Sequence, residues 1–226
     1  MKKILLTIIT LTSLSSLAQV KIKAGINSSS ISGSIKTDLT HGPGANGRIY
    51  ENGDYKDYTD SKQGIYIGIG YDIQISDKVT FIPELLYNQY GAEEKYNYRR
   101  IDRESDFYKL DYLSVPVMIR YEFIPRLSIG LGPQINFLLN PKSTYNYLNV
   151  KEQHEDVDFY NKIYLGANGD LSYNIWNGLS IDFRYHFGLS NSGYNGEIKD
   201  PNTLTVFKIN NKAHNHAIQI GLSYNF

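Results

Sequence analysis

Residues 178–191 read GLSIDFRYHFGLSN, and this stretch decides the fold. From Leu179 to Leu189 the odd positions are all large and apolar, whereas the even positions are small or polar and include Asp182, Arg184 and His186. Such strict alternation predicts a β-strand with one apolar and one polar face. An apolar face without a break over this length is typical of an outer-membrane barrel, where lipid covers the outer face of every strand.

Seven further segments show the same alternation. They cover residues 20–27, 63–76, 79–90, 107–123, 126–139, 157–175 and 217–226. Long polar segments, which we expect to be loops, alternate with turns of a few residues. The expected loops cover residues 28–62, 91–106, 140–156 and 192–212. An even number of strands with loops at one end and turns at the other predicts an all-β fold, an eight-stranded antiparallel up-and-down transmembrane β-barrel.

Aromatic residues are expected to form a girdle at each membrane interface. Near the turns the candidates are Tyr71, Tyr121, Phe123, Tyr173, Trp176 and Phe226. Near the loops they are Tyr87, Phe137, Tyr160 and Phe187.

The composition excludes several kinds of protein. The 226 residues carry 23 basic and 23 acidic side chains, and this balance argues against nucleic acid as a partner. The absence of Cys removes disulfides, thiolate metal sites and Cys nucleophiles. The mean hydropathy of −0.38 is compatible with a barrel, because only alternate residues of each strand face lipid.

The first residues have the features of a targeting segment. A basic start, Met1-Lys2-Lys3, precedes an apolar run, and Ser16-Leu17-Ala18 fits a cleavage site. We expect residues 1–18 to be a signal peptide and residues 19–226 to form the outer-membrane barrel domain. The alternative is a membrane anchor, but the apolar run is shorter than the roughly 20 residues that a spanning helix needs.

A soluble eight-stranded barrel, such as a lipocalin, is the alternative fold. Three features argue against it. The polar faces are crowded with Gly and small polar residues, which suits a narrow lumen. The apolar faces carry too many large groups for the interior of an eight-stranded barrel. The sequence also ends on an aromatic residue, Phe226.

Two motifs carry a resemblance to known proteins. The last strand, IGLSYNF at residues 220–226, looks like the signal that the barrel assembly machinery reads, with Phe226 as its terminal aromatic residue. The run YLSVPVMIRY at residues 112–121, followed by IGLGPQ at residues 129–134, resembles the PorT-like outer-membrane β-barrel family. This resemblance implies a small outer-membrane barrel and a link to protein secretion and gliding, since a named member has that role.

The polar faces place charges of both signs in the predicted lumen. They are Lys23, Asp72, Glu84, Arg120, Glu122, Asp170, Asp182 and Arg184, together with His186. Because side chains fill an eight-stranded barrel and unpaired buried charge is costly, we expect a network of ion pairs. Our hypothesis pairs Arg120 and Arg184 with some of the carboxylates. A gated path for ions or protons through this network is the alternative.

The sequence predicts no catalytic, cofactor or metal site. Ser180, Asp182 and His186 share a face, but their i, i+2 spacing spreads them along one strand instead of bringing them together. His214 and His216 share a face near the loops and could meet His186 in a metal site at the rim, although ordinary polar residues explain them as well.

We therefore expect a non-enzymatic protein of the cell outer membrane whose long loops bind or assemble with a partner protein. Its other partners would be outer-membrane lipids and, during biogenesis, the barrel assembly machinery. A narrow gated pore is the second hypothesis, and a lipid-acting enzyme is the third.

Overall fold

The computed structural model describes residues 18–41, 49–54, 59–94, 103–147, 150–155, 160–193, 195–199 and 206–226. Every regular element in these ranges is a β-strand. The strands are β1 (Ala18–His41), β2 (Ile49–Asp54), β3 (Thr59–Ser76), β4 (Val79–Glu94), β5 (Arg103–Ile124), β6 (Leu127–Tyr147), β7 (Val150–Glu155), β8 (Ile163–Trp176), β9 (Leu179–Gly188), β10 (Asn195–Lys199) and β11 (Val206–Asn225). Within the described part of the chain, no helix has the length and apolar character needed to cross a membrane.

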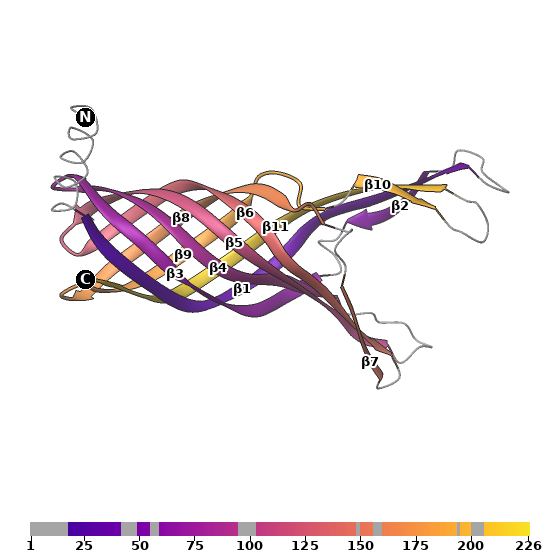
Figure 1. The fold of residues 1–226 in the computed structure, drawn as a ribbon, viewed down its shortest axis with the longest axis horizontal. Helices are drawn as coiled ribbons and strands as arrows, with labels where there is room; N and C mark the ends of the chain where they lie inside the picture. Colours follow the sequence, from indigo (N-terminus) through magenta and orange to yellow (C-terminus); the bar gives the residue numbers. More distant parts are fainter. Residues whose placement is uncertain are drawn as a thin grey trace, which may run out of the picture.

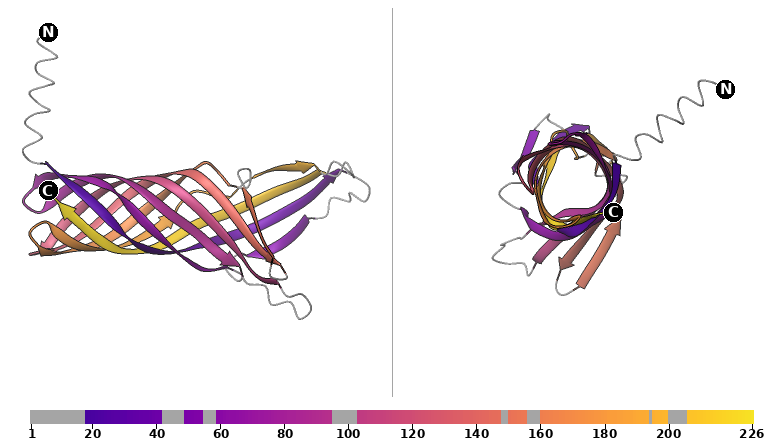
Figure 2. Two further views of the ribbon diagram at one scale, coloured as in Figure 1. Left: turned by 60° about the horizontal axis from the view of Figure 1, so that its bottom comes forward. Right: turned by 90° about the vertical axis from the view of Figure 1, so that its left-hand side faces the viewer.

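The strands close into a barrel. Neighbours follow the order β1-β3-β4-β5-β6-β8-β9-β11, all antiparallel, and β11 pairs with β1 to complete the ring (Figures 1 and 2). Among the described residues this gives eight barrel strands, as the alternation predicted. The closing pair runs from Lys21 opposite Asn225 up to His41 opposite Val206, with one irregularity near Leu39.

Where the structure describes them, the segments expected to be loops are largely β-structure, which corrects the sequence prediction. β1 continues to His41 and β11 begins at Val206, so both strands extend far beyond the barrel wall. β2 pairs with β1, β10 with β11, and β7 with β6 in these extensions (Figure 1). Polar composition misled the prediction because both faces of these extensions lie outside the apolar belt, where strands need no apolar alternation.

The faces of the strands agree with the alternation. In β9 the burial alternates at every position, and Phe183 and Tyr185 face outward while Asp182, Arg184 and His186 are buried. Large apolar side chains are exposed around the whole outer wall; Leu131, for example, is 67% exposed. An apolar surface this extensive, on a closed barrel, is one that lipid covers.

The turn end carries the predicted girdle. Tyr121, Phe123, Tyr173, Trp176 and Phe226 are all exposed there. At the loop end Phe187 faces outward, but Tyr160 does not, because it packs against the buried cluster inside the barrel. The prediction that Tyr160 joins the upper girdle is therefore wrong. Tyr160 lies outside the regular strands, where alternation gives no guide to direction.

Candidate functional site

The turn-end half of the lumen is filled by charged side chains. Four basic and four acidic residues from six strands meet there, and none has a side chain more than 15% exposed. They are Lys21 and Lys23 of β1, Asp72 of β3, Glu84 of β4, Arg120 of β5, Asp170 of β8, and Asp182 and Arg184 of β9. We call these eight residues the charge layer.

Arg184 is the centre of the charge layer. Its Nη1 donates to Glu84 Oε2 at 2.6 Å, and its Nη2 donates to Glu84 Oε1 at 3.1 Å and to Asp170 Oδ2 at 3.1 Å. Arg120 Nη2 reaches the same Asp170 oxygen at 2.8 Å. Lys23 Nζ lies 2.9 Å from Glu84 Oε1 and 3.3 Å from Asp182 Oδ2. Every cation therefore faces a carboxylate, which buried charges require.

Glycines on the inner face make room for this layer. A Cβ at Gly130 would collide with the carboxylate of Asp170, its cross-strand partner. A Cβ at Gly70 would lie 3.3 Å from Glu84 Cγ. The lumen is narrow, and it can hold these long charged side chains because the residues that face them are glycines, which have no side chain.

The structure brings most of the predicted lumen charges together. Glu84, Arg120, Asp170, Asp182 and Arg184 form the connected part of the charge layer. Asp72 lies nearer the turn end, where it pairs with Lys21 at 2.6 Å and accepts a hydrogen bond from Asn225 Nδ2 at 2.9 Å. The two arginines pair with carboxylates as the hypothesis stated.

Two predicted members lie elsewhere, and one member was missed. Glu122 is exposed at the turn end, where its N–H donates to Lys78 O at 2.8 Å, so its assignment to the lumen network is corrected. Alternation predicts whether a side chain points into the lumen or outward. It does not predict how far along the barrel axis the buried part of the lumen extends. His186 is buried, but above the charge layer. Lys21 was overlooked, although its spacing from Lys23 placed both on the inner face.

Above the charge layer lies a layer of amides and one hydroxyl. Asn88 Nδ2 donates to Ser114 Oγ at 2.9 Å, and Ser114 Oγ donates to Asn136 Oδ1 at 2.7 Å. Gln219 Nε2 donates to Asn88 Oδ1 at 2.8 Å, and Asn168 Nδ2 donates to Gln134 Oε1 at 2.7 Å. We call these residues the amide layer. They hydrogen-bond to one another across the lumen, so this section is closed as well.

Aromatic rings fill the next section. Tyr90 stacks on His186 with ring centroids 5.5 Å apart, and Tyr112 meets Tyr164 edge-on at 5.1 Å. His186 Nδ1 lies 2.9 Å from Asn168 Oδ1, and its Nε2 lies 3.0 Å from the Tyr164 hydroxyl. Because an amide oxygen only accepts, Nδ1 carries a proton and donates to Asn168, while Nε2 forms a second hydrogen bond with the Tyr164 hydroxyl.

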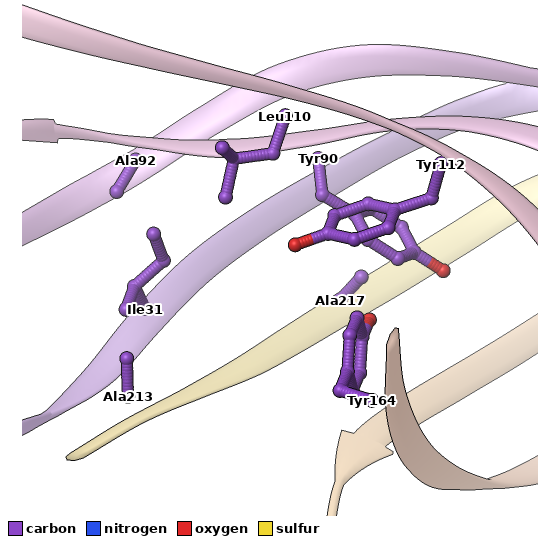
Figure 3. Packing of buried hydrophobic residues seen from close by; sticks show 8 residues of the cluster. All are labelled: Ile31, Tyr90, Ala92, Leu110, Tyr112, Tyr164, Ala213 and Ala217. Carbon is purple, nitrogen blue, oxygen red and sulfur yellow. The ribbon is translucent and has the colours of Figure 1, made fainter. Parts of the chain in front are cut away.

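An apolar cap completes the filling at the loop end. Ile31, Ala92, Leu110 and Ala213 pack beside the three tyrosines, which form one cluster with them (Figure 3). Above the belt, burial and the neighbouring ammonium of Lys109 lower the pKa of the Lys62 side chain. The charge layer, the amide layer, the rings and the apolar cap thus occupy the lumen in sequence from the turns to the loops.

Among the described residues, no group of three or more His, Cys, Asp or Glu side chains could hold a metal ion. Asp182 and Arg184 belong to the charge layer, whereas His186 lies among the rings with Tyr164 and Asn168 as its partners. His216 contacts Tyr185 and Phe187, which face outward, whereas His186 is buried inside. These two histidines lie on opposite sides of the wall, so they do not form the rim metal site considered from the sequence.

The sequence matches the family model described as "Outer membrane protein beta-barrel domain" over residues 13–193. The chain belongs to this family. The cell outer membrane is accordingly the location of this outer-membrane barrel, as its apolar wall indicates. The match supports the broad family, and membership of the narrower PorT-like group stays a prediction.

Solved structures of outer-membrane proteins are similar to this chain, and the first of them shares its fold. The outer membrane protein OprG from Pseudomonas aeruginosa is 12% identical, with a TM-score of 0.51 over 92% of this chain and 96% of that chain. Ail, the attachment invasion locus protein of Yersinia pestis, is 13% identical, with a TM-score of 0.42 over 92% and 99% of the two chains. A search of curated proteins finds no match.

Proposed function

We propose that this barrel is a non-enzymatic surface protein that anchors two projecting β-sheets and binds a partner protein through them. The observation that carries the proposal is the continuation of the barrel strands beyond the wall. β1 and β11 stay paired up to His41 opposite Val206, with β2 and β10 on either side. We call this four-stranded sheet the first blade.

A second blade rises on the other side of the opening. It consists of the upper parts of β4, β5 and β6 with β7 at its edge, and β5 remains paired with β6 up to Arg103 opposite Tyr147 (Figure 1). Among the described strands, β2, β7 and β10 each pair along one edge only. Free strand edges outside a membrane are templates for β-strand addition by another protein.

The filled lumen supports a binding role over conduction. From the charge layer to the apolar cap, buried side chains contact one another across the barrel. The resemblance to PorT-like proteins favours a partner from a secretion apparatus. The proposal therefore places the partner on the blades and gives the barrel the role of an anchor.

The test is to extract the protein gently from its own membrane and identify co-migrating proteins by native electrophoresis and mass spectrometry. Two matched variants assign the partner. One replaces residues 35–59 and residues 195–205 with short Gly/Ser turns and removes β2 and β10, and the other replaces residues 142–155 and removes β7. Heat-dependent migration in detergent gels checks that each variant folds. Loss of a stoichiometric partner in one variant supports the proposal. A lone barrel, a partner retained by both variants, or steady single-channel currents would overturn it.

A further inference from the structure

A groove of about 820 Å³ lies on the outer wall near the loop end, formed by β1, β9 and β11. It lies at the base of the first blade, and its lining includes Ile31 and Ala217 of the buried cluster. Its lining includes Ser30 and Ser32 of β1, Tyr185 and Phe187 of β9, and His214 and His216 of β11. In volume it is within the range of small-molecule sites, which is roughly 300–1,000 Å³.

The groove adds polar side chains to a largely apolar lining near the top of the wall. Between Asn225 and His216 the strand climbs about 23 Å, at roughly 3.4 Å per residue and a tilt of about 40°. This is close to the top of an apolar band of about 25 Å. At a comparable distance from its turn, β6 presents Leu139, which is exposed. In the sector of β1 and β11, serines and histidines replace such residues.

The polar side chains of the groove are held in place by the wall. His216 Nε2 lies 2.8 Å from Ser32 Oγ, and its Nδ1 lies 3.3 Å from the Tyr185 hydroxyl. The Phe187 ring packs edge-on against the same imidazole, with centroids 5.0 Å apart. His216 lines the groove, and its contacts restrict the side-chain conformations of Ser32, Tyr185 and Phe187. The groove is therefore pre-formed.

The charge of the groove favours an anion. Its described lining contains no acidic residue. His214 lies directly opposite Ser32, and Lys212, exposed on the same face of β11, lies opposite Ser34. Serine hydroxyls, an imidazole and an ammonium group together are donors suited to phosphate oxygens.

The apolar wall continues directly below these donors. Ile218 lines the groove, and the next outward residue of β11, Ile220, is exposed on the belt. On β1 the exposed Ile26 lies below Ser28. A ligand with its anionic group among Lys212 and His214 would therefore lay its tails along isoleucines, which is the geometry of a membrane lipid.

We infer that this groove binds the phosphate-bearing headgroup of a lipid in the outer leaflet, with its acyl chains on β1 and β11. The site fixes one lipid to one sector of the wall, on the side of the first blade.

Native mass spectrometry of the full chain in zwitterionic detergent tests the inference. The probes are phosphatidic acid and diacylglycerol of the same chain length, which differ only in the phosphate. Wild type should retain phosphatidic acid at least about tenfold more tightly, which corresponds to one charge-assisted contact. In K212A/H214A this preference should disappear. These substitutions spare His216 and its contacts.

The matched control is Gln89→Leu, which removes an outward polar residue of β4 at the loop end, where Gln89 Nε2 donates to the Tyr87 hydroxyl at 3.1 Å. Q89L should bind both lipids as wild type does, and heat-dependent gel migration confirms that the variants are folded. Equal binding of phosphatidic acid by K212A/H214A and wild type would overturn the inference. So would displacement of the lipid by inorganic phosphate at equal concentration, or a dimer of this chain that excludes lipid.

Discussion

The two halves of the lumen are filled by opposite chemistries, although the same strands line both. β4 contributes Glu84 to the charge layer and Tyr90 to the rings, and β9 contributes Arg184 below and His186 above. At the turn end, four cations and four carboxylates neutralise one another. At the loop end, neutral rings and small apolar side chains occupy the same cross-section.

This difference shows that the lumen of a barrel can be filled in two ways, and that the two fillings should respond differently to amino-acid substitutions. In the charge layer, the loss of one partner leaves another charge unpaired in a site shielded from water. Single substitutions should therefore lower stability far more than paired ones. Among the rings, each residue contributes packing and at most a hydrogen bond, so losses should be smaller and closer to additive.

The largest effect is expected for Arg184→Ala. This change leaves Glu84 and Asp170 with one cation fewer, and it should lower the free energy of unfolding by about 3–5 kcal/mol, the usual cost of breaking a buried ion pair. Urea unfolding from lipid vesicles, followed by the fluorescence of the single Trp176, measures it.

The double variant Arg184→Met with Glu84→Gln is the matched control. It removes one charge of each sign and leaves Lys23 facing Asp182 and Arg120 facing Asp170. We expect the double variant to recover much of the stability lost by Arg184→Ala, because no charge is left without a partner. A double variant that is less stable than the single one would show that the charge layer is not held together by charge balance.

The next largest effect is expected when a guanidinium group is placed on the outer face of the wall, level with the charge layer inside. Leu131 neighbours Gly130, which faces Asp170 of the charge layer, but Leu131 itself points outward. Leu131→Arg should cost about 2–4 kcal/mol, as expected for a basic residue on the lipid face near the membrane centre. The same unfolding experiment in vesicles checks it. A cost near zero would mean that Leu131 does not face lipid.

Alternation in the sequence predicted most of the charge layer, because inward and outward residues differ in polarity in the lower half of most strands; β4, with its buried Ile82 and Leu86, is an exception. It identified Arg120, Arg184 and their carboxylates, and it failed at Glu122 because it carries no information on height. The ring section could not be predicted in this way. Tyr90, Tyr112 and Tyr164 point inward, and tyrosine is equally suited to a membrane interface.

The blades were missed for a related physical reason. Polar segments such as residues 28–62 have the composition of loops, and alternation disappears once both faces of a strand meet water. The pairing of β1 with β11 instead continues from the barrel, so a register set by the apolar belt is carried outward into polar sequence. This continued pairing is visible only in the three-dimensional structure, where β1 and β11 lie side by side.

A smaller effect is expected in the ring section from Tyr164→Phe. The change keeps the ring and removes the hydroxyl that lies 3.0 Å from His186 Nε2. A ring nitrogen buried without its hydrogen-bond partner should lower the free energy of unfolding by about 1–2 kcal/mol. Tyr173→Phe on the exposed outer wall is the control and should change little. Equal effects of the two variants would contradict the hydrogen-bonded role of Tyr164.

The smallest effect lies outside both halves, at the turn between β5 and β6. Arg126 has a φ of 72°, a conformation that strains every residue with a Cβ, whereas Gly178 occupies a comparable position between β8 and β9 with a φ of 82°. Arg126→Gly should therefore raise the free energy of unfolding by about 1 kcal/mol. Arg126→Ala, which keeps the Cβ, should leave stability unchanged in the same experiment. If alanine stabilised the barrel as much as glycine, the gain would come from removing the guanidinium side chain, and the backbone at this turn would carry no strain.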